Sequence, residues 1–275
     1  MAQNLTINST FALKSGHKLP ILGFGVWDSP KHLTVQSCQE ALKVGYRHID
    51  TAQVYGNEAE VGEAVRKSGL SRKDVFITSK AVTPADDDAT TYQKILDSVK
   101  KIDGDDGYLD LFLIHNVTSG AKGVKLLWQA MEKLHEEGKI KSIGVSNTGI
   151  GMIEGMKSYA KLHPWCQQRE VVEFCHKNGI AVEAYCPLVR NQKANDSTLK
   201  AIAEKHGKST AQVLLRYCLE KAWSPLPKSD NPERIKQNAS IYDFALDQDD
   251  ISKLDAQDQG SSGALVVAVD NKKTS

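Results

Sequence analysis

The chain has 275 residues, of which 40% are hydrophobic and 25% are charged, and its formal net charge is +1. That length suits one large α/β domain with a sizeable core, and the small net charge gives no basic excess to attract nucleic acid. The N-terminus lacks the apolar run of a secretory signal, and no apolar run is long enough to span a bilayer. Five scattered cysteines without a CxxC pair indicate neither a zinc site nor a disulfide framework. We therefore expect a cytoplasmic protein with no nucleic-acid or membrane partner.

The predicted elements begin with a short hairpin, in which "FALKSG" and "KLPILG" flank a turn at Gly16-His17. Apolar runs typical of buried parallel strands follow at 21–25, 46–50, 75–80, 109–115, 142–147, 180–185 and 223–227. Helical patterns lie between them at 32–44, 57–69, 123–137, 167–178, 196–206 and 209–221. Repeated strand–helix units predict a parallel sheet covered by helices.

Two architectures fit such units, an open doubly wound sheet or a closed barrel. An open dinucleotide-binding sheet calls for GxGxxG after its first strand, whereas "GFGVWD" at 23–28 has only the first two glycines. Polar residues instead end nearly every predicted strand, which is where a barrel builds its active site. They are Asp50, Lys80, His115, Asn147, Tyr185 and Lys228. We predict an α/β fold of the TIM-type (β/α)8 barrel class, formed as a single domain over 1–275.

Four of the polar residues near strand ends suggest acid catalysis. Tyr55 follows Asp50 within "DTAQVYGNEAEVG", and Lys80 and His115 end later strands. A lysine beside a phenol lowers the phenol's pKa, a carboxylate can orient the lysine, and a histidine can orient a carbonyl oxygen. Together they would make Tyr55 a positioned acid for an oxyanion as it forms. Taken singly, each residue also fits a structural role: Asp50 in a turn, Tyr55 in packing, Lys80 at a solvated rim and His115 in the core. The prediction therefore rests on finding all four together at strand ends.

The segment "PKSDNPERIKQN" at 227–238 suggests an anion site. It offers Lys228, Ser229, Arg234 and Asn238 at the start of a short helix. Cationic and hydroxyl side chains at a helix N-terminus suit a phosphate monoester. The alternative interpretation is a charged, capped helix with no ligand.

Five segments together resemble the aldo-keto reductase family. They are "GYRHIDTAQVYGNEAEVG", "FITSK", "LDLFLIH", "GKIKSIGVSN" and "PLPKSDNPERIKQN", and the resemblance extends over about residues 11–260. It implies a TIM-type barrel with an N-terminal β-hairpin across its bottom. It also implies reversible reduction of aldehydes and ketones with NADPH and without a metal. On these motif matches Tyr55 would be the proton donor, with Asp50, Lys80 and His115 as its partners.

The resemblance also implies a cofactor site for NADPH/NADP+. It assigns Lys228, Ser229 and Arg234 to the adenosine 2′-phosphate, which favours NADPH over NADH, and Gln237 and Asn238 to the adenine side. The other implied cofactor residues are Gly25, Val26, Asp50, Ser146, Asn147, Tyr185, Pro187 and Leu188. Among these, Ser146 and Asn147 match residues that bind the nicotinamide carboxamide, and Tyr185 matches the aromatic residue that stacks on the ring. The implied substrate residues are Trp27, Tyr55, His115 and Asn116.

The chain departs from the family after "GVSN". Relatives continue through a helix and a strand that carries an Asn-Gln pair before a His-Pro pair. Here "GIGMIEGMKSYAKLHPWCQQ" at 149–168 reaches His163-Pro164 early, as if about ten residues were missing after Lys161. The sixth strand is then either missing or remodelled from "MKSYAKL", and both alternatives leave the barrel strained or open near strands five to seven.

Two further departures concern the substrate pocket. Asn116 stands where many relatives have an aromatic residue, and Val82 where some have tryptophan. We therefore expect a less aromatic pocket.

The leading hypothesis is an NADP-dependent aldo-keto reductase that acts on a small-molecule carbonyl compound. The alternative is a catalytically impaired or non-catalytic cofactor-binding relative, because the lost segment removes one carboxamide contact. A different barrel enzyme, such as an isomerase, would leave the pairing of Tyr55 with Lys80 unexplained. We expect a monomer, because no long exposed apolar segment stands out.

Overall fold

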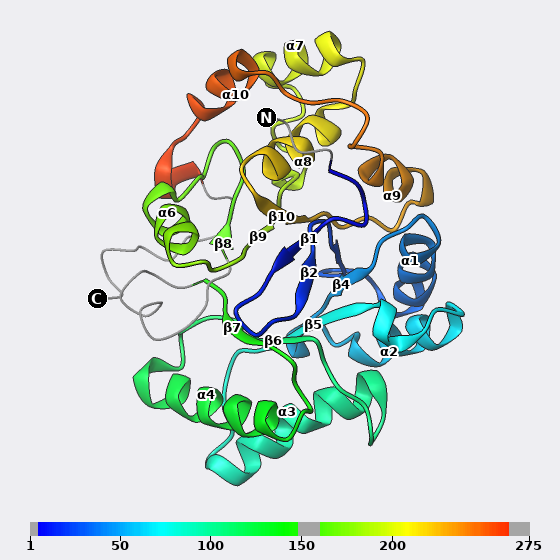
Figure 1. The fold of residues 1–275 in the computed structure, drawn as a ribbon, viewed down its shortest axis with the longest axis vertical. Coiled ribbons are helices and arrows are strands. Elements are labelled where there is room, and N and C mark those ends of the chain that lie inside the picture. The colour runs from blue at the N-terminus through cyan, green and yellow to red at the C-terminus, as the bar shows by residue number, and fades with distance from the viewer. Residues whose placement is uncertain (1–4, 148–159, 264–275) are drawn as a thin grey trace.

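The computed structural model describes residues 5–147 and 160–263. It begins with an antiparallel hairpin of β1 (Thr10–Ala12) and β2 (Lys18–Pro20), joined through the predicted turn, where Gly16 adopts φ 84°. Only glycine takes this left-handed conformation without a steric cost. Figure 1 shows the hairpin in front of the ring of strands, across one end of it. This is the end where the strands begin, because Ser15 and Ser142 join their hydroxyls at 2.7 Å just before β7 (Ile143–Val145).

Parallel strands form the wall behind the hairpin, in the order of the sequence. Besides β7 they are β3 (Phe24–Gly25), β4 (His48–Asp50), β5 (Phe76–Ala81), β6 (Leu111–Ile114), β8 (Ala160–Lys161), β9 (Val182–Tyr185) and β10 (Trp223–Leu226). Strand ladders run through β3-β4-β5-β6-β7 and through β10-β9-β8. Backbone bonds of 3.1 Å from Gly23 N to Pro225 O and from Gly25 N to Pro227 O connect β3 to β10. The strand order is therefore that of the predicted (β/α)8 barrel.

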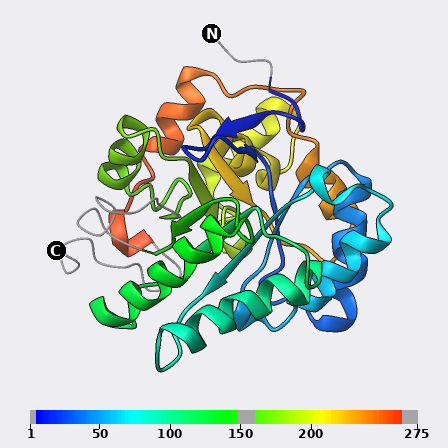
Figure 2. The same cartoon turned by 60° about the horizontal axis from the view of Figure 1, so that its bottom comes forward.

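Helices surround the strands on the outside (Figure 1). In chain order they are α1 (Lys31–Lys43), α2 (Glu58–Lys67), α3 (Asp88–Asp103), α4 (Gly120–Glu136), α6 (Arg169–Lys177), α7 (Ser197–His206), α8 (Thr210–Glu220), α9 (Pro232–Ala239) and α10 (Gln248–Asp255). Short 3-10 turns add η1 (Gln53–Tyr55), η2 (Arg72–Asp74), η3 (Val189–Asn191) and η4 (Gly260–Gly263). Figure 2 shows α3 and α4 side by side along one flank of the barrel. Across the described residues no helix is both long and apolar enough to cross a membrane.

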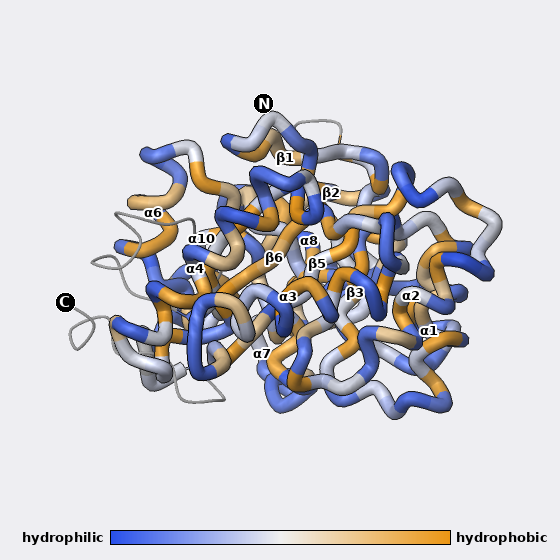
Figure 3. Tube along the Cα trace, turned by 90° about the horizontal axis from the view of Figure 1, so that it is seen from below, coloured by the Kyte–Doolittle hydropathy of each residue, from blue (hydrophilic) through white to orange (hydrophobic). Residues whose placement is uncertain are grey.

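The core has one layer inside the barrel and one between strands and helices. The inner layer includes Leu19 of β2, Leu113 of β6 and Leu226 of β10. In the outer layer α4 buries Leu127 and Met131, as its helical spacing predicts. Figure 3 shows hydrophobic residues along β6 and hydrophilic residues on the peripheral loops.

The sixth strand of the barrel is present in the described residues. Among the described residues of "MKSYAKL", β8 forms a ladder that pairs Ala160 with Ala184 and Lys161 with Tyr185 of β9. The structure therefore supports the remodelled alternative rather than a missing strand; the expected helical stretch before it lies outside the described residues. Among those that are described, no ladder joins β7 to β8. We call this interruption between β7 and the β8–β9 pair the seam.

Candidate active site

The predicted acid and its partners come from three neighbouring strands. Asp50 ends β4, Lys80 lies near the end of β5, His115 follows β6, and Tyr55 ends the turn η1 after β4. The carboxyl ends of parallel strands share one rim, so the four side chains converge there. Gly56 takes φ 69° directly after η1, and this lets the chain reverse into α2.

The loop that carries Tyr55 is fastened to the barrel by a buried amide. Thr51 Oγ1 donates to Asn57 Oδ1 at 2.7 Å, and Asn57 Nδ2 donates to Val26 O at 3.0 Å. Asn57 is fully buried, so these bonds are shielded from water. They fix the position of η1 and therefore of Tyr55.

Lys80 and Asp50 form an ion pair inside the barrel. Lys80 Nζ lies 2.7 Å from Asp50 Oδ1 and donates to Thr51 O at 2.9 Å. Burial alone would lower the pKa of Lys80, but the charge of Asp50, together with Tyr55, raises it above its usual value. Lys80 therefore carries a positive charge close to the ring of Tyr55.

Tyr55 faces both Lys80 and His115. The ammonium of Lys80 lies 5.1 Å from the centroid of the Tyr55 ring, and the His115 ring meets Tyr55 edge to face with 5.6 Å between centroids. Burial raises the pKa of Tyr55 and outweighs the lowering effect of Lys80. Lys80 lowers the pKa of Tyr55, as the sequence predicts, but burial has the larger effect and the pKa of Tyr55 rises overall. Tyr55 is therefore a protonated phenol near neutral pH.

His115 is a neutral imidazole near neutral pH. Burial, and after it the charge of Lys80, lowers its pKa from 6.5 to about 3. Its Nδ1 is buried and has no hydrogen-bond partner among the residues that the structure describes. A neutral ring at this place can donate one N–H to an oxygen bound beside Tyr55.

The predicted nicotinamide residues lie where the rim crosses the seam. Asn147 follows β7, and its Nδ2 donates to His115 O at 2.8 Å and to Ser146 Oγ at 3.0 Å. The hydroxyl of Tyr185, at the end of β9, donates to Asn147 Oδ1. This contact joins β7 to β9 across the seam and holds the half-buried Tyr185 ring at the rim.

The predicted phosphate residues gather at the start of α9. Ser229 is buried, Lys228 is half-buried and Arg234 is exposed. Asn231 caps the helix by accepting from Arg234 N at 3.0 Å. Farther along α9, Gln237 is exposed and Asn238 is buried.

Asp230 is a residue of this segment that sequence analysis missed. Its Oδ2 lies 2.5 Å from Lys228 Nζ, and its Oδ1 accepts from Ser29 Oγ at 2.6 Å and Ser37 Oγ at 2.9 Å. Burial alone would raise the pKa of Asp230, but these donors lower it. Lys228 is thus already paired with a carboxylate. The only signal in the sequence was an acidic residue within "KSDN".

The remaining predicted cofactor residues differ in exposure. The Val26 side chain is fully buried in the core, and Gly25 and Pro187 are also buried. Leu188 is half-buried and packs against the core. Of these four residues, Leu188 therefore offers exposed surface to a ligand.

The predicted substrate residues lie at the mouth of the site. Trp27 is 44% exposed, and the guanidinium of Arg190 stacks 4.4 Å from its ring centroid. Asn116 accepts from Thr118 N at 3.2 Å, so its side chain shapes its own loop. Val54, next to Tyr55, is 61% exposed. Sequence analysis missed Arg190 and Val54, although the position of Val54 beside Tyr55 was a signal.

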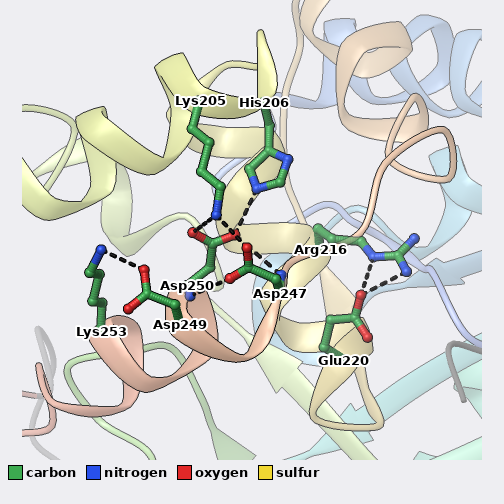
Figure 4. Close-up of polar contacts among 8 residues, drawn as sticks. All are labelled: Lys205, His206, Arg216, Glu220, Asp247, Asp249, Asp250 and Lys253. Carbon is green, nitrogen blue, oxygen red and sulfur yellow. Dashed lines mark hydrogen bonds and ion pairs between the residues drawn. The ribbon is translucent and has the colours of Figure 1, made fainter.

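One acidic cluster is the closest approach to a metal site in the described part of the chain. Asp247, Asp249 and Asp250 place their oxygens within 4.8 Å of one another. Figure 4 shows the ammonium groups of Lys205 and Lys253 and the ring of His206 already directed at these carboxylates. The cluster is therefore an ion-pair network.

The comparisons with known proteins agree with this geometry. A sequence profile described as "Aldo/keto reductase family" matches residues 21–259. Glyoxal reductase of Bacillus subtilis (strain 168) is 38% identical over 261 residues, which cover 91% of this chain and 93% of the relative. Methylglyoxal reductase DkgA of Escherichia coli (strain K12) is 35% identical over 259 residues, with coverage of 90% and 93%.

Solved structures show the same fold. The crystal structure of an aldo/keto reductase from Brucella melitensis is 42% identical and has a TM-score of 0.85, covering 91% of this chain and 99% of that one. The predicted TIM-type barrel and the predicted family are both confirmed. The chain belongs to the aldo/keto reductase family and is an oxidoreductase.

Proposed function

We propose that this protein reduces small aldehydes and ketones to alcohols with NADPH, and that Tyr55 is the general acid. The observation that carries the proposal is the buried group at the rim. A protonated Tyr55 lies over the charged Lys80–Asp50 pair and against the neutral His115. Such a group can stabilise and protonate an oxyanion.

Each residue has a distinct part in the proposed reaction. The carbonyl oxygen would lie between the Tyr55 hydroxyl and a His115 N–H, which together orient it. A reduced nicotinamide, when bound, supplies hydride to the carbonyl carbon. As charge develops on the oxygen, Tyr55 gives it a proton, and Lys80 stabilises the phenolate that remains. Asp50 holds Lys80 in place through the 2.7 Å contact.

The segment around α9 supports NADPH as the cofactor. A phosphate monoester suits Lys228, Ser229 and Arg234 in chemistry, and the N-terminus of α9 adds its partial positive charge. Among the described residues Arg234 makes no ion pair, so its charge is available to an anion. We propose that the 2′-phosphate binds here with the adenine near Gln237 and Asn238. Ser146, Asn147 and Tyr185 would hold the nicotinamide, and Gly25, Val26, Pro187 and Leu188 would contribute backbone or apolar contacts.

The substrate class follows from the mouth of the site and from the relatives. The names of two relatives give glyoxal and methylglyoxal as their substrates. Here Trp27 and Val54 offer exposed apolar surface, and the polar Asn116 follows His115. We propose small 2-oxoaldehydes as the preferred carbonyl compounds, with Trp27 and Asn116 in contact with them.

We further propose that the protein works as a single-domain cytoplasmic monomer. Trp27 and Val54 are the exposed large hydrophobic side chains of the described residues, and the mouth of the site accounts for both. No wide apolar surface is left there for a partner subunit. Sedimentation of the purified protein checks this proposal.

The test of the function is NADPH oxidation by the purified protein with methylglyoxal and with an aromatic aldehyde. Tyr55→Phe is the matched variant, because it removes only the proton that is transferred. We expect turnover in the parent protein and almost none in the variant, with NADPH binding by fluorescence unchanged. Equal turnover in both would reject Tyr55 as the acid. NADPH binding without turnover in the parent protein would favour the non-catalytic alternative.

A further inference from the structure

The seam contains a small pocket that reaches the inside of the barrel. It lies between Ile143 and Gly144 of β7 and Ala181 and Glu183 at the start of β9, with Ser15 of the hairpin at its lower edge. We call it the seam pocket. Its volume is about 40 Å³. Because one ordered water needs about 15 Å³, it has room for about two or three waters and is too small for an organic ligand.

Glu183, which is among the residues that line the seam pocket, is an acidic residue in an otherwise largely apolar wall. The residue is only 3% exposed. Its Oε1 is buried and has no hydrogen-bond partner among the described residues. A buried carboxyl oxygen of this kind is costly unless the group is neutral or meets water. The proposed mechanism does not use this residue.

The neighbouring histidine is not in a state to ionise Glu183. His48 Nε2 lies 3.6 Å from Glu183 Oε1, beyond hydrogen-bonding distance, and 2.9 Å from Thr78 Oγ1. The ring of His48 also packs against Gly23, because a Cβ added at Gly23 would lie only 2.5 Å from His48 Nδ1. Burial, followed by the charge of Lys80, lowers the pKa of His48 from 6.5 to about 3. His48 is therefore neutral.

The charged groups that face Glu183 come from three elements. Asp50 of β4 and Lys80 of β5 lie within electrostatic range, and Lys14 of the hairpin lines the seam pocket. Burial and the charge of Asp50 raise the pKa of Glu183 well above its usual range, against the opposing effect of Lys80. An ionised Glu183 would add a second carboxylate to the Asp50–Lys80 pair.

We propose that Glu183 is a positioning residue, held as a neutral carboxylic acid within electrostatic range of Lys80, and that it exchanges its proton with solvent through the seam pocket. Because Glu183 is neutral, the positive charge of Lys80 interacts with Asp50 and Tyr55 and meets no second carboxylate at Glu183. When Glu183 loses its proton to water in the pocket, the new carboxylate attracts Lys80 and makes Tyr55 a weaker acid. Of this proposal, the kinetic consequence rests on the proposed function, whereas the protonation state does not.

Infrared spectroscopy tests the protonation state without any activity. The protein should show the carbonyl-stretch band of a protonated carboxylic acid at neutral pH, and Glu183→Gln should abolish it. Glu58→Gln is the matched control, because Glu58 is also buried but bonds to Ser79 Oγ at 2.6 Å, and this variant should keep the Glu183 band. Absence of the band, or its persistence in Glu183→Gln, would overturn the proposal.

The seam pocket is tested by the rate at which that band shifts in D2O. Ala181→Val adds bulk to the pocket wall outside the catalytic group, so the shift should become slower than in the parent protein. An unchanged rate would reject the pocket as the exchange path.

The pH profile of kcat tests the positioning role. Glu183→Gln mimics the neutral acid, so turnover at neutral pH should persist and its alkaline fall should move to higher pH. If the pH profiles of the parent protein and of Glu183→Gln coincide, the positioning role is overturned, because a purely structural residue would leave the profile unchanged. A band assigned to Glu183 in a protein without turnover would instead overturn the proposed function and leave the neutral Glu183 intact.

Discussion

Lys80 Nζ lies 2.7 Å from Asp50 Oδ1, although the two side chains are only 1% and 5% exposed. Both charges lose their hydration on folding, so each depends on the other and on the carbonyl of Thr51. The pair therefore ties the ends of β4 and β5 together at the point where Tyr55 needs a fixed charge.

Removing one charge of this pair should destabilise the fold. We expect Asp50→Asn to lower the free energy of unfolding by about 3–5 kcal/mol, because it leaves Lys80 charged and buried without its counter-ion. The control is Glu63→Gln, which breaks the exposed pair with Lys67 and should cost about 0–1 kcal/mol. Chemical denaturation measures both. Equal losses in the two variants would contradict a special role for the buried pair.

The neutral state of His115 has a kinetic signature. Because the pKa of His115 is lowered to about 3, kcat/KM for carbonyl reduction should show no break near its ordinary value of 6.5. His115→Ala should reduce kcat by about 100- to 1000-fold, the typical cost of losing one donor to an oxyanion. His115→Gln keeps an N–H donor and should retain more activity. A break near 6.5 that disappears in His115→Gln would show that the imidazolium takes part.

The buried His48 should make the fold sensitive to acid. Its folded pKa of about 3 is below the ordinary 6.5, so between these values the unfolded chain binds a proton that the folded chain does not. Stability should therefore fall as the pH drops from 6.5 towards 3, by up to about 1.4 kcal/mol per pH unit for one such group.

The slope of stability against pH distinguishes His48 from other histidines. His48→Asn should flatten this slope, whatever it does to the stability itself. His32→Asn, at an exposed position, should leave the slope unchanged. Urea unfolding at several pH values measures it, and equal slopes in the parent protein and His48→Asn would reject the argument.

The sequence predicted the strands and the positions of the candidate catalytic residues for related physical reasons. Buried parallel strands are continuous apolar runs, so β5 and β6 were visible, and the polar residue that ends each run marks the rim. Asp50, Lys80 and His115 were therefore placed correctly from local pattern alone. The strand at β8 was only one of two alternatives for "MKSYAKL", because the weak alternation of this segment says little and its described residues are defined as a strand by pairing with β9.

Other features depend on tertiary contacts that no local pattern contains. Glu183 stands inside the apolar run of β9, and the sequence does not tell which face of that strand points into the barrel. Asp230 acquires its role from Ser29 and Ser37, which are far away in the chain. The helix α3 did carry a local signal, a capping box between Asp87 and Thr90, and was missed because polar residues dominate its first turn.

The network around α10 should stabilise the fold without a metal. Asp250 is 1% exposed and accepts from both Lys205 at 2.8 Å and His206 at 2.7 Å (Figure 4). We expect Asp250→Ala to cost about 1–3 kcal/mol, because it removes the carboxylate between Lys205 and His206 and leaves Lys205 with Asp247 alone. Asp249→Ala removes only the exposed pair with Lys253 and should cost less than about 1 kcal/mol.

Thermal unfolding with and without magnesium or calcium checks the same network. Since cationic side chains already meet these carboxylates, neither ion should raise the Tm. A clear rise that Asp250→Ala abolishes would show instead that the cluster binds a cation.

Asp230 should set how strongly the protein distinguishes the two nicotinamide cofactors. Its carboxylate holds Lys228 at 2.5 Å beside the proposed 2′-phosphate site, so it both positions the lysine and repels an anion. Asp230→Asn keeps an oxygen to accept from Ser29 and Ser37 but removes the negative charge. We expect the variant to bind NADPH more tightly by several-fold, with no change for NADH, because only NADPH carries the 2′-phosphate.

The matched variant is Arg234→Met, which removes a positive charge from the proposed 2′-phosphate site. It should weaken the binding of NADPH several-fold and leave the binding of NADH unaffected. Fluorescence titration of the four protein–cofactor combinations at two salt concentrations measures the effect, and added salt should reduce the preference for NADPH. If Asp230→Asn weakened both cofactors equally, Asp230 would serve the loop contacts with Ser29 and Ser37 rather than the charge balance. If Arg234→Met left the preference unchanged, the phosphate would not bind at the start of α9.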